Sequence, residues 1–291
     1  MTGAPFTMTH ETTVAATPQA LYALVADTEG APRYAGGQMH AEILSSGADG
    51  DVIKRWVYSE RGLRAWTFRR TVDAAAPSIV FAHVDPAPPV VDQRGTWTFT
   101  ALGDGTTLVR VEHVIELVDP AGEAKMRAGF DQQIPQQLAG YRLVAELGAE
   151  LAERYVTSEE TAVVAGTAAQ VRARLAAQDV WTGRHPGATG AEATALGDDA
   201  WLVEVTGTQA RYFRLEPNAT DIVWKSLSPA AGLHAELGRF RIAQAAPDKV
   251  EVTVTHTATL PLKGPGAEPA AVRAAGRAEL RRLLALLGGA A

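Results

Sequence analysis

Two polar side chains lie on strand faces that are otherwise apolar. Along residues 109–117 every second residue is apolar except His113, which therefore shares the face of the apolar set. On another predicted strand, Arg70 shares a face with Trp66 and Phe68. A guanidinium among aromatic rings can bind a ligand oxygen, and an imidazole with a pKa near neutrality can transfer a proton. Arg70 and His113 are therefore the first candidates for a site.

Each candidate also has a structural interpretation. Arg69 precedes Arg70, and a one-residue β-bulge would exchange their faces. His113 fits a core histidine that is hydrogen-bonded to a helix equally well. Trp97 and Phe99 are typical of residues that line or pack an interior.

The spacing of apolar residues predicts the elements that carry these side chains. A short strand leads to Thr17-Pro18, which is a helix-start signal. In the following loop, which is rich in Gly and Pro, Tyr34 and Gln38 either gate a cavity mouth or are solvated. Period-two spacing over 41–117 predicts several antiparallel strands, and a helical stripe then extends to about Arg154. This is an α+β domain, in which a curved sheet around a long helix encloses a cavity if the inward residues do not fill it.

The chain contains this pattern twice. Segments 94–99 and 109–113 recur as 237–242 and 252–256, at a constant offset of 143 residues. A repeat of this length predicts a tandem duplication of whole domains, which we place at residues 1–156 and 157–291.

The two copies differ at one candidate position. The second copy keeps His256 and Phe240 as its pocket residues, but a plain alignment places Leu215 where the first copy has Arg70. The cavity of the first domain is therefore the predicted catalytic site. The second domain is a degenerate copy for which a structural role is open.

The composition argues against several classes of function. Hydrophobic residues make up 46% of the chain, and no apolar run approaches the ~20 residues that a membrane helix needs. No export signal is recognisable, so we expect a cytoplasmic protein without membrane contact. A net charge of −6 argues against nucleic acid. The absence of cysteine, of clustered histidines and of nucleotide motifs predicts neither a metal nor another cofactor.

Four segments together resemble a known family: Ala-Glu-Ile-Leu at 41–44, Trp66-x-Phe68-x-Arg70, Trp97-Thr98-Phe99, and Val111-Glu112-His113 before a long helix. In this combination the chain resembles the polyketide aromatase/cyclases, which are START-like helix-grip proteins of bacterial type II polyketide synthases. The duplication resembles their two-domain class. The resemblance implies two tandem helix-grip domains, each a curved antiparallel sheet around a long C-terminal helix.

The resemblance also implies roles for single residues. Arg70 matches the pocket arginine that polarises a substrate carbonyl, and His113 matches a position implicated in positioning or proton transfer. Trp66 and Trp97 match pocket aromatics. Gln38 stands where one relative has a pocket tyrosine, so the regiochemistry of ring closure is not predicted.

The expected function is that of an aromatase/cyclase. It would fold a poly-β-ketone, tethered by phosphopantetheine to an acyl carrier protein, against Trp66, Phe68 and Trp97, and catalyse first-ring aldol closure, dehydration or both. The ketosynthase and ketoreductase of the same synthase are further expected partners. The alternative is a non-catalytic carrier or sensor of a hydrophobic metabolite, in which Arg70 anchors a carboxylate.

Overall fold

The computed structural model describes residues 3–288 and divides them into two compact units between Leu151 and Ala152. The boundary lies five residues before the one expected at 156/157. The reason is that Tyr155 and Val156 already belong to the first strand of the second unit, where they pair with Thr259 and Ala258.

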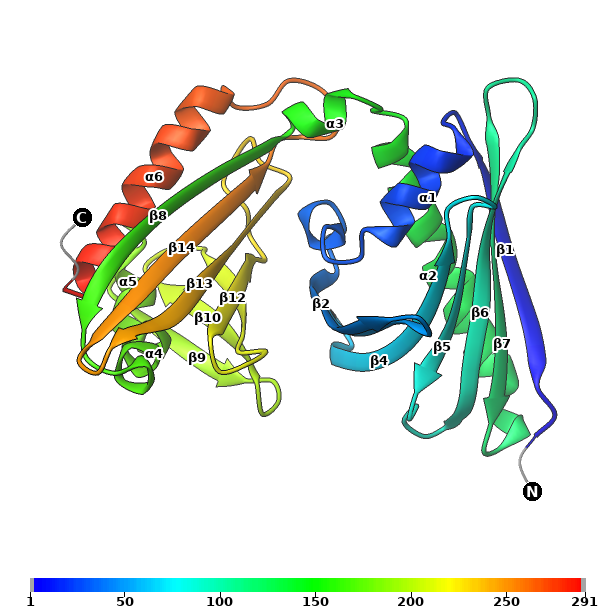
Figure 1. The fold of residues 1–291 in the computed structure, drawn as a ribbon, viewed down its shortest axis with the longest axis horizontal. Coiled ribbons are helices and arrows are strands. Elements are labelled where there is room, and N and C mark those ends of the chain that lie inside the picture. The colour runs from blue at the N-terminus through cyan, green and yellow to red at the C-terminus, as the bar shows by residue number, and fades with distance from the viewer. Residues whose placement is uncertain (1–2, 289–291) are drawn as a thin grey trace. The chain divides into compact units, whose positions relative to one another are not determined.

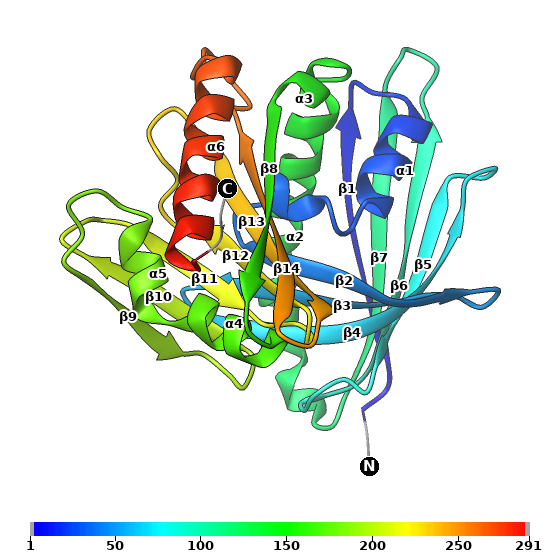
Figure 2. The same cartoon turned by 60° about the vertical axis from the view of Figure 1, so that its left-hand side comes forward.

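The first unit is a seven-stranded antiparallel sheet that curves around a long helix, α2 (Figure 1). Strands β2–β4 run steeply across β1 and β7 (Figure 2), and the spatial order of the strands is β1-β7-β6-β5-β4-β3-β2. Its elements are β1 (Phe6–Val14), α1 (Pro18–Ala26), the 3₁₀ turn η1 (Ala31–Arg33), β2 (Gln38–Gly47), β3 (Gly50–Ser59), β4 (Gly62–Asp73), β5 (Ser78–Val84), β6 (Val90–Ala101), β7 (Thr107–Leu117), η2 (Pro120–Gly122) and α2 (Glu123–Ala145).

Local sequence signals account for these boundaries. Thr17 caps α1, accepting a hydrogen bond from the Ala20 backbone N–H, and Pro18 occupies the first turn. The Gly-containing turns at 47–50 and 103–105 join β2 to β3 and β6 to β7. The helix start predicted at Thr17-Pro18 is confirmed.

The long helix is shorter than predicted. Helix α2 ends at Ala145 and not near Arg154, because Gly148 adopts a φ of +53° that does not continue an α-helix. The separate short helix α3 (Glu150–Glu153) follows. Leu138, Tyr141 and Val144 of the predicted stripe are buried.

The second unit repeats the topology of the first, in the order β8-β14-β13-β12-β11-β10-β9. The predicted α+β fold with two tandem helix-grip domains is confirmed. Its elements are β8 (Tyr155–Ala165), α4 (Ala168–Ala176), α5 (Gln178–Gly183), β9 (Gly190–Ala195), β10 (Ala200–Thr206), β11 (Arg211–Leu215), β12 (Asp221–Ser226), β13 (Ala235–Ala246), β14 (Lys249–Thr259) and α6 (Pro269–Leu286).

One row of paired residues crosses both sheets in the same register and defines which residues of the two copies are equivalent. The row reads Arg70, Phe81, Gly95 and His113 over β4–β7, and Arg214, Trp224, Gly238 and His256 over β11–β14. In each row the aromatic ring lies over the glycine. A Cβ atom at Gly95 would lie 2.6 Å from Phe81 Cζ, and one at Gly238 would lie 2.5 Å from Trp224.

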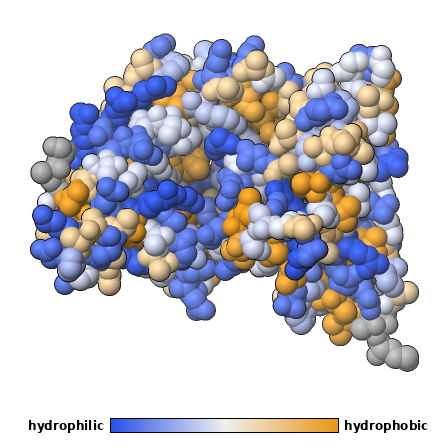
Figure 3. Space-filling view, in the orientation of Figure 1, coloured by the Kyte–Doolittle hydropathy of each residue, from blue (hydrophilic) through white to orange (hydrophobic). Residues whose placement is uncertain are grey.

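Hydrophilic and hydrophobic residues are interleaved over the face of the molecule seen in Figure 3. Among the residues that the structure describes, no helix has the length and apolar character to cross a membrane.

We expect Gly95→Ala to destabilise the protein by about 1–3 kcal/mol, because the new methyl group would overlap the Glu112 carbonyl oxygen and the Phe81 ring. Urea unfolding followed by tryptophan fluorescence measures the change. Gly129→Ala in α2 is the matched control, since its Cβ would meet open space and alanine favours a helix over glycine by up to about 1 kcal/mol. Equal midpoints for Gly95→Ala and the wild type would show that the row is loosely packed.

Candidate active site

Arg70 lies on the inward face of β4, as predicted. It is 7% exposed, whereas Arg69 is on the outer face and exposed. The Arg70 guanidinium donates from Nε and Nη2 to Asp51 Oδ2, at 3.2 and 3.1 Å. Nη1 donates to the carbonyl of Ala26, the last residue of α1, and to Thr28 Oγ1, both at 2.7 Å. Arg70 therefore ties the end of α1 to the sheet, and most of its donors are already used.

Arg214 makes the equivalent contact in the second domain. Its Nη1 donates to the carbonyl of Ala176, the last residue of α4, at 2.7 Å. The expectation that Leu215 replaces Arg70 is therefore wrong. The sheet register aligns Arg214 with Arg70, because the loops joining the strands differ in length between the copies and the plain alignment is shifted by one residue at β11. This arginine does not distinguish the two domains.

Arg55 is a further inward arginine of the first domain, and the sequence analysis missed it. It pairs with Trp66 across β3 and β4 and so shares the inward face. Within residues 3–288 its Nε atom is buried without a hydrogen-bond partner, and its guanidinium forms no ion pair. It lies over the Phe68 ring, 5.2 Å from the centroid. Burial lowers the pKa of Arg55, an effect that Tyr141 and Tyr34 oppose.

A sequence signal for Arg55 did exist. The two-residue turn between Ser59 and Gly62 fixes the register of the β3–β4 hairpin. Since Trp66 was expected to face inward, its cross-strand neighbour Arg55 had to face inward too. That turn was not recognised.

Aromatic side chains from three elements surround this part of the interior. The Tyr141 ring of α2 packs edge-to-face against Tyr34, at 6.3 Å between centroids, and against Trp97, at 5.8 Å. Trp97 and Phe68 are each 7% exposed, so both are buried as predicted. The Trp66 ring stacks on His83 at 6.2 Å.

Tyr34, in the loop after α1, and Gln38, the first residue of β2, are buried at 7% and 8% exposure. The Tyr34 hydroxyl donates to the Leu24 carbonyl at 3.4 Å, and Gln38 Nε2 donates to the Thr28 carbonyl at 3.2 Å. Both side chains hold the loop against α1 and its C-terminal end, where Arg70 also binds. A role for them in gating stays a prediction.

His113 lies inside the first domain between two phenylalanine rings. Its centroid is 5.5 Å from Phe81 and 4.9 Å from Phe130 of α2, and its buried Nδ1 has no hydrogen-bond partner among the described residues. The hydrogen bond to the helix that a core histidine would make is thus not formed at this atom. Burial, with smaller effects of His10 and His83, lowers the pKa of His113 to about 4.

His83 is a second inward histidine, which the sequence analysis did not select. It pairs with Phe68 across β4 and β5, two residues along the strand from Phe81. Burial, and then the charge of Arg55, lower the pKa of His83 to about 4, although Asp92 opposes this. The imidazole is therefore neutral at pH 7.

The second domain also contains an inward arginine, but its charge is compensated. The Arg184 guanidinium lies 3.8 Å from the Trp224 ring centroid, and its Nη2 is 2.7 Å from Glu279 Oε1 of α6. Next to it, Tyr212 Oη and His185 Nε2 are 2.5 Å apart, and burial raises the pKa of Tyr212 to about 12. The Arg184 charge is thus paired with Glu279, although the buried Arg184 Nη1 has no hydrogen-bond partner among the described residues.

His256 and Phe240, the predicted pocket residues of the second domain, are both buried. Phe240 is fully buried in the hydrophobic core. His256 stacks on Trp224 and its Nε2 lies 3.5 Å from Glu236 Oε1, an ion-pair distance that is too long for a well-formed hydrogen bond. A Cβ at Gly276 of α6 would lie 3.0 Å from His256 Nδ1, so the helix packs closely over this histidine.

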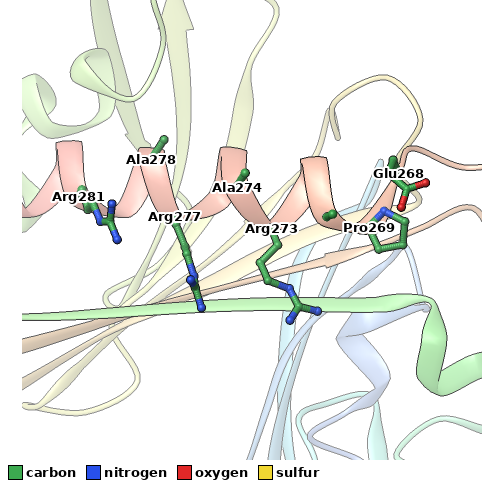
Figure 4. Close-up of a pocket in the computed structure, with 8 residues that line it drawn as sticks. Glu268, Pro269, Arg273, Ala274, Arg277, Ala278 and Arg281 are labelled. Carbon is green, nitrogen blue, oxygen red and sulfur yellow. The ribbon is translucent and has the colours of Figure 1, made fainter.

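An open groove on the second domain follows α6 (Figure 4). Arg273, Arg277 and Arg281 line it at one-turn intervals, and Arg281 Nη2 is 3.1 Å from Glu160 Oε1 of β8. These three arginines are exposed. The interior of the first domain is therefore the stronger candidate, because Arg55 is half-buried with a buried Nε atom, and water screens its charge less than it screens the three exposed arginines.

We expect Arg70→Leu to lower the free energy of unfolding by about 3 kcal/mol or more, since it leaves Asp51 and the end of α1 without their donor. Urea unfolding of the full chain measures this. Arg69→Leu, on the exposed face of the same strand, is the control. A fully stable Arg70→Leu protein that forms no product would instead support the catalytic role implied by the resemblance.

The low pKa of His113 predicts a pH effect on stability. The unfolded chain binds a proton at the ordinary pKa of about 6.5, but the folded protein does so only near pH 4, so stability falls as the pH is lowered through this window. His113→Leu should reduce the loss by up to about 3 kcal/mol. Melting temperatures at pH 7 and pH 4.5 test this, with the exposed His234→Leu as control. An unchanged pH dependence would show that folding does not lower the pKa of His113.

Comparison with known proteins agrees with this architecture. Residues 5–146 match the family described as "Polyketide cyclase / dehydrase and lipid transport". The granaticin polyketide synthase bifunctional cyclase/dehydratase of Streptomyces violaceoruber is 27% identical over 197 residues, which are 66% of this chain and 61% of that protein. The actinorhodin polyketide synthase bifunctional cyclase/dehydratase of Streptomyces coelicolor is 27% identical over 257 residues, 82% of this chain and 79% of that protein.

A solved structure extends the similarity to both domains. StfQ, a di-domain ARO/CYC from the steffimycin biosynthetic pathway, superimposes with a TM-score of 0.79 and 26% sequence identity over 96% of each chain. The strand order, the duplicated row and these matches lead to one assignment. The first domain belongs to the polyketide cyclase/dehydrase and lipid transport family, and the chain has the tandem architecture of the di-domain aromatase/cyclases.

Proposed function

We propose that this protein is a cyclase/dehydratase of aromatic polyketide biosynthesis that forms the first ring of a poly-β-ketone. The family and the two Streptomyces relatives support the reaction class. The substrate would arrive on the phosphopantetheine arm of an acyl carrier protein, and the ketosynthase and ketoreductase of the same synthase are the expected neighbours. We place the reaction in the first domain.

The observation that carries this proposal is the unpaired guanidinium of Arg55. Its interior position, over Phe68 and near Tyr34 and Tyr141, leaves a positive charge without an acidic partner. Such a charge stabilises an oxygen that becomes negative in the transition state, and shielding from water strengthens the effect. In the second domain the inward arginine is Arg184, which follows α5 and forms an ion pair with Glu279.

Ring closure is an aldol reaction. An enolate carbon of the chain attacks a ketone carbon, and the carbonyl electron pair moves onto oxygen, where Arg55 would stabilise the alkoxide. Protonation gives a β-hydroxy ketone, and loss of water gives a carbon–carbon double bond. Trp66, Phe68 and Trp97 would hold one folded conformer of the chain. Arg70, predicted as the polarising group, would act as a positioning residue that fixes the end of α1.

The roles of His113 and of the second domain remain proposals. His113 is neutral at pH 7 and would serve proton transfer in the dehydration, provided that the substrate reaches the space between Phe81 and Phe130. The second domain would act mainly as a structural partner, because Arg184 and His256 face the acidic groups Glu279 and Glu236.

A carrier or sensor function is the second candidate, supported by the same observation. An unpaired guanidinium also binds a carboxylate, and such a protein would return its ligand unchanged. Product analysis separates the two functions.

We expect Arg55→Gln to lower the yield of correctly cyclised aromatic product by about 10²–10³-fold, because it removes the pre-placed charge. The assay is chromatography of products from a synthase reconstituted with ketosynthase, acyl carrier protein and the full-length variant. Arg55→Lys should restore part of the activity, and the exposed Arg69→Gln should match the wild type. Wild-type product from Arg55→Gln would remove Arg55 from the mechanism.

A further inference from the structure

We infer that Arg55 and His83 together form a binding site for a β-diketone unit, in which His83 takes the proton from the central carbon and Arg55 holds the resulting enolate. This rests on the proposed function and assigns its enolisation step to one site. It places the catalytic base on β5, whereas the sequence favoured His113 on β7.

The two side chains flank one strand on the same face of the sheet. Arg55 pairs with Trp66 across β3 and β4, and His83 pairs with Phe68 across β4 and β5. From strand geometry their Cα atoms are about 12 Å apart. The Arg55 side chain extends over the Phe68 ring, towards the strand pair that carries His83.

Aromatic rings form two sides of this site. The Trp66 and His83 rings stack with an interplanar angle of 12°. Phe68 forms the floor beneath the guanidinium. Planar conjugated groups, such as the enol or enolate of a β-diketone, pack well on such surfaces.

Neither polar group is committed to the protein. Within residues 3–288, Arg55 makes no hydrogen bond or ion pair, and His83 makes no hydrogen bond. The nearby charged groups that act on His83 are Arg55 and Asp92. His113, by contrast, lies between two phenylalanines. The neutral imidazole of His83 is the form that accepts a proton.

The chemistry balances without a further reactant. The C–H bond at the central carbon breaks, its proton moves to His83, and its electron pair delocalises onto the two carbonyl oxygens beside Arg55. The negative charge on those oxygens offsets the repulsion that Arg55 exerts on the imidazolium. After the enolate carbon forms the new C–C bond, the imidazolium returns the proton to the alkoxide, and His83 is neutral again.

Hydrogen–deuterium exchange at the central carbon of 1-phenylbutane-1,3-dione tests this with the full-length protein in D₂O. NMR measures the exchange rate, and the ultraviolet spectrum gives the pKa of the bound diketone. We expect His83→Gln to reduce protein-catalysed exchange by about 10²-fold or more with binding changed less than threefold. Arg55→Gln should raise the pKa of the bound diketone by about one unit or more, while Arg69→Gln should match the wild type.

Several outcomes would overturn the assignment. These are exchange that persists in His83→Gln, exchange that is lost in His113→Gln while His83→Gln retains it, and the absence of protein-catalysed exchange in the wild type. Circular dichroism and melting temperature confirm that each variant is folded. Exchange that depends on His83 without aromatic product from a reconstituted synthase would uphold the site and refute the proposed function. Aromatic product with exchange independent of His83 would do the reverse.

Discussion

Each domain depends on how the short helix after its first strand is held to the sheet. In both copies a buried arginine donates from Nη1 to the last carbonyl of that helix at 2.7 Å, Arg70 to Ala26 and Arg214 to Ala176. The last carbonyls of a helix have no partner inside it, and a charged donor satisfies one of them. In the first domain the same contact anchors the following loop, which brings Tyr34 against Tyr141 and closes the aromatic interior. Because its donors are used in these contacts, this arginine stabilises the fold.

The two interiors differ in whether their remaining arginine is compensated. Arg184 lies among aromatic rings but pairs with Glu279, so most of its field is cancelled locally. Arg55 lies over Phe68 with no such partner. An unpaired charge in a desolvated interior destabilises the folded protein, and a ligand that supplies the missing negative charge offsets this effect. The two arginines are not equivalent, because Arg184 follows α5 whereas Arg55 belongs to β3.

The interior of the first domain that contains Arg55 also contains two neutral imidazoles. His83 and His113 both have pKa values lowered to about 4 by burial, and Arg55 contributes at His83. A positive charge that stabilises an enolate also keeps a neighbouring base unprotonated until negative charge develops on the substrate. The cation and the base then support each other only when substrate is bound. In the second domain the imidazole of His256 lies 3.5 Å from Glu236 Oε1, whereas no acidic side chain lies beside His113 among the described residues.

Much of this protein follows from local pattern alone. Alternating residues on β7 placed His113 inside, the strand 66–70 placed Trp66, Phe68 and Arg70 inside, and the repeat at offset 143 predicted the tandem fold. These succeed because strand faces and duplications are set by periodicity, which is a property of sequence. The equivalence of Arg214 with Arg70, and the isolation of Arg55, depended instead on loop lengths and on which acid reaches which guanidinium. Such facts are decided by contacts between distant strands, so only the tertiary structure could separate the arginine that holds the fold from the one left free for a ligand.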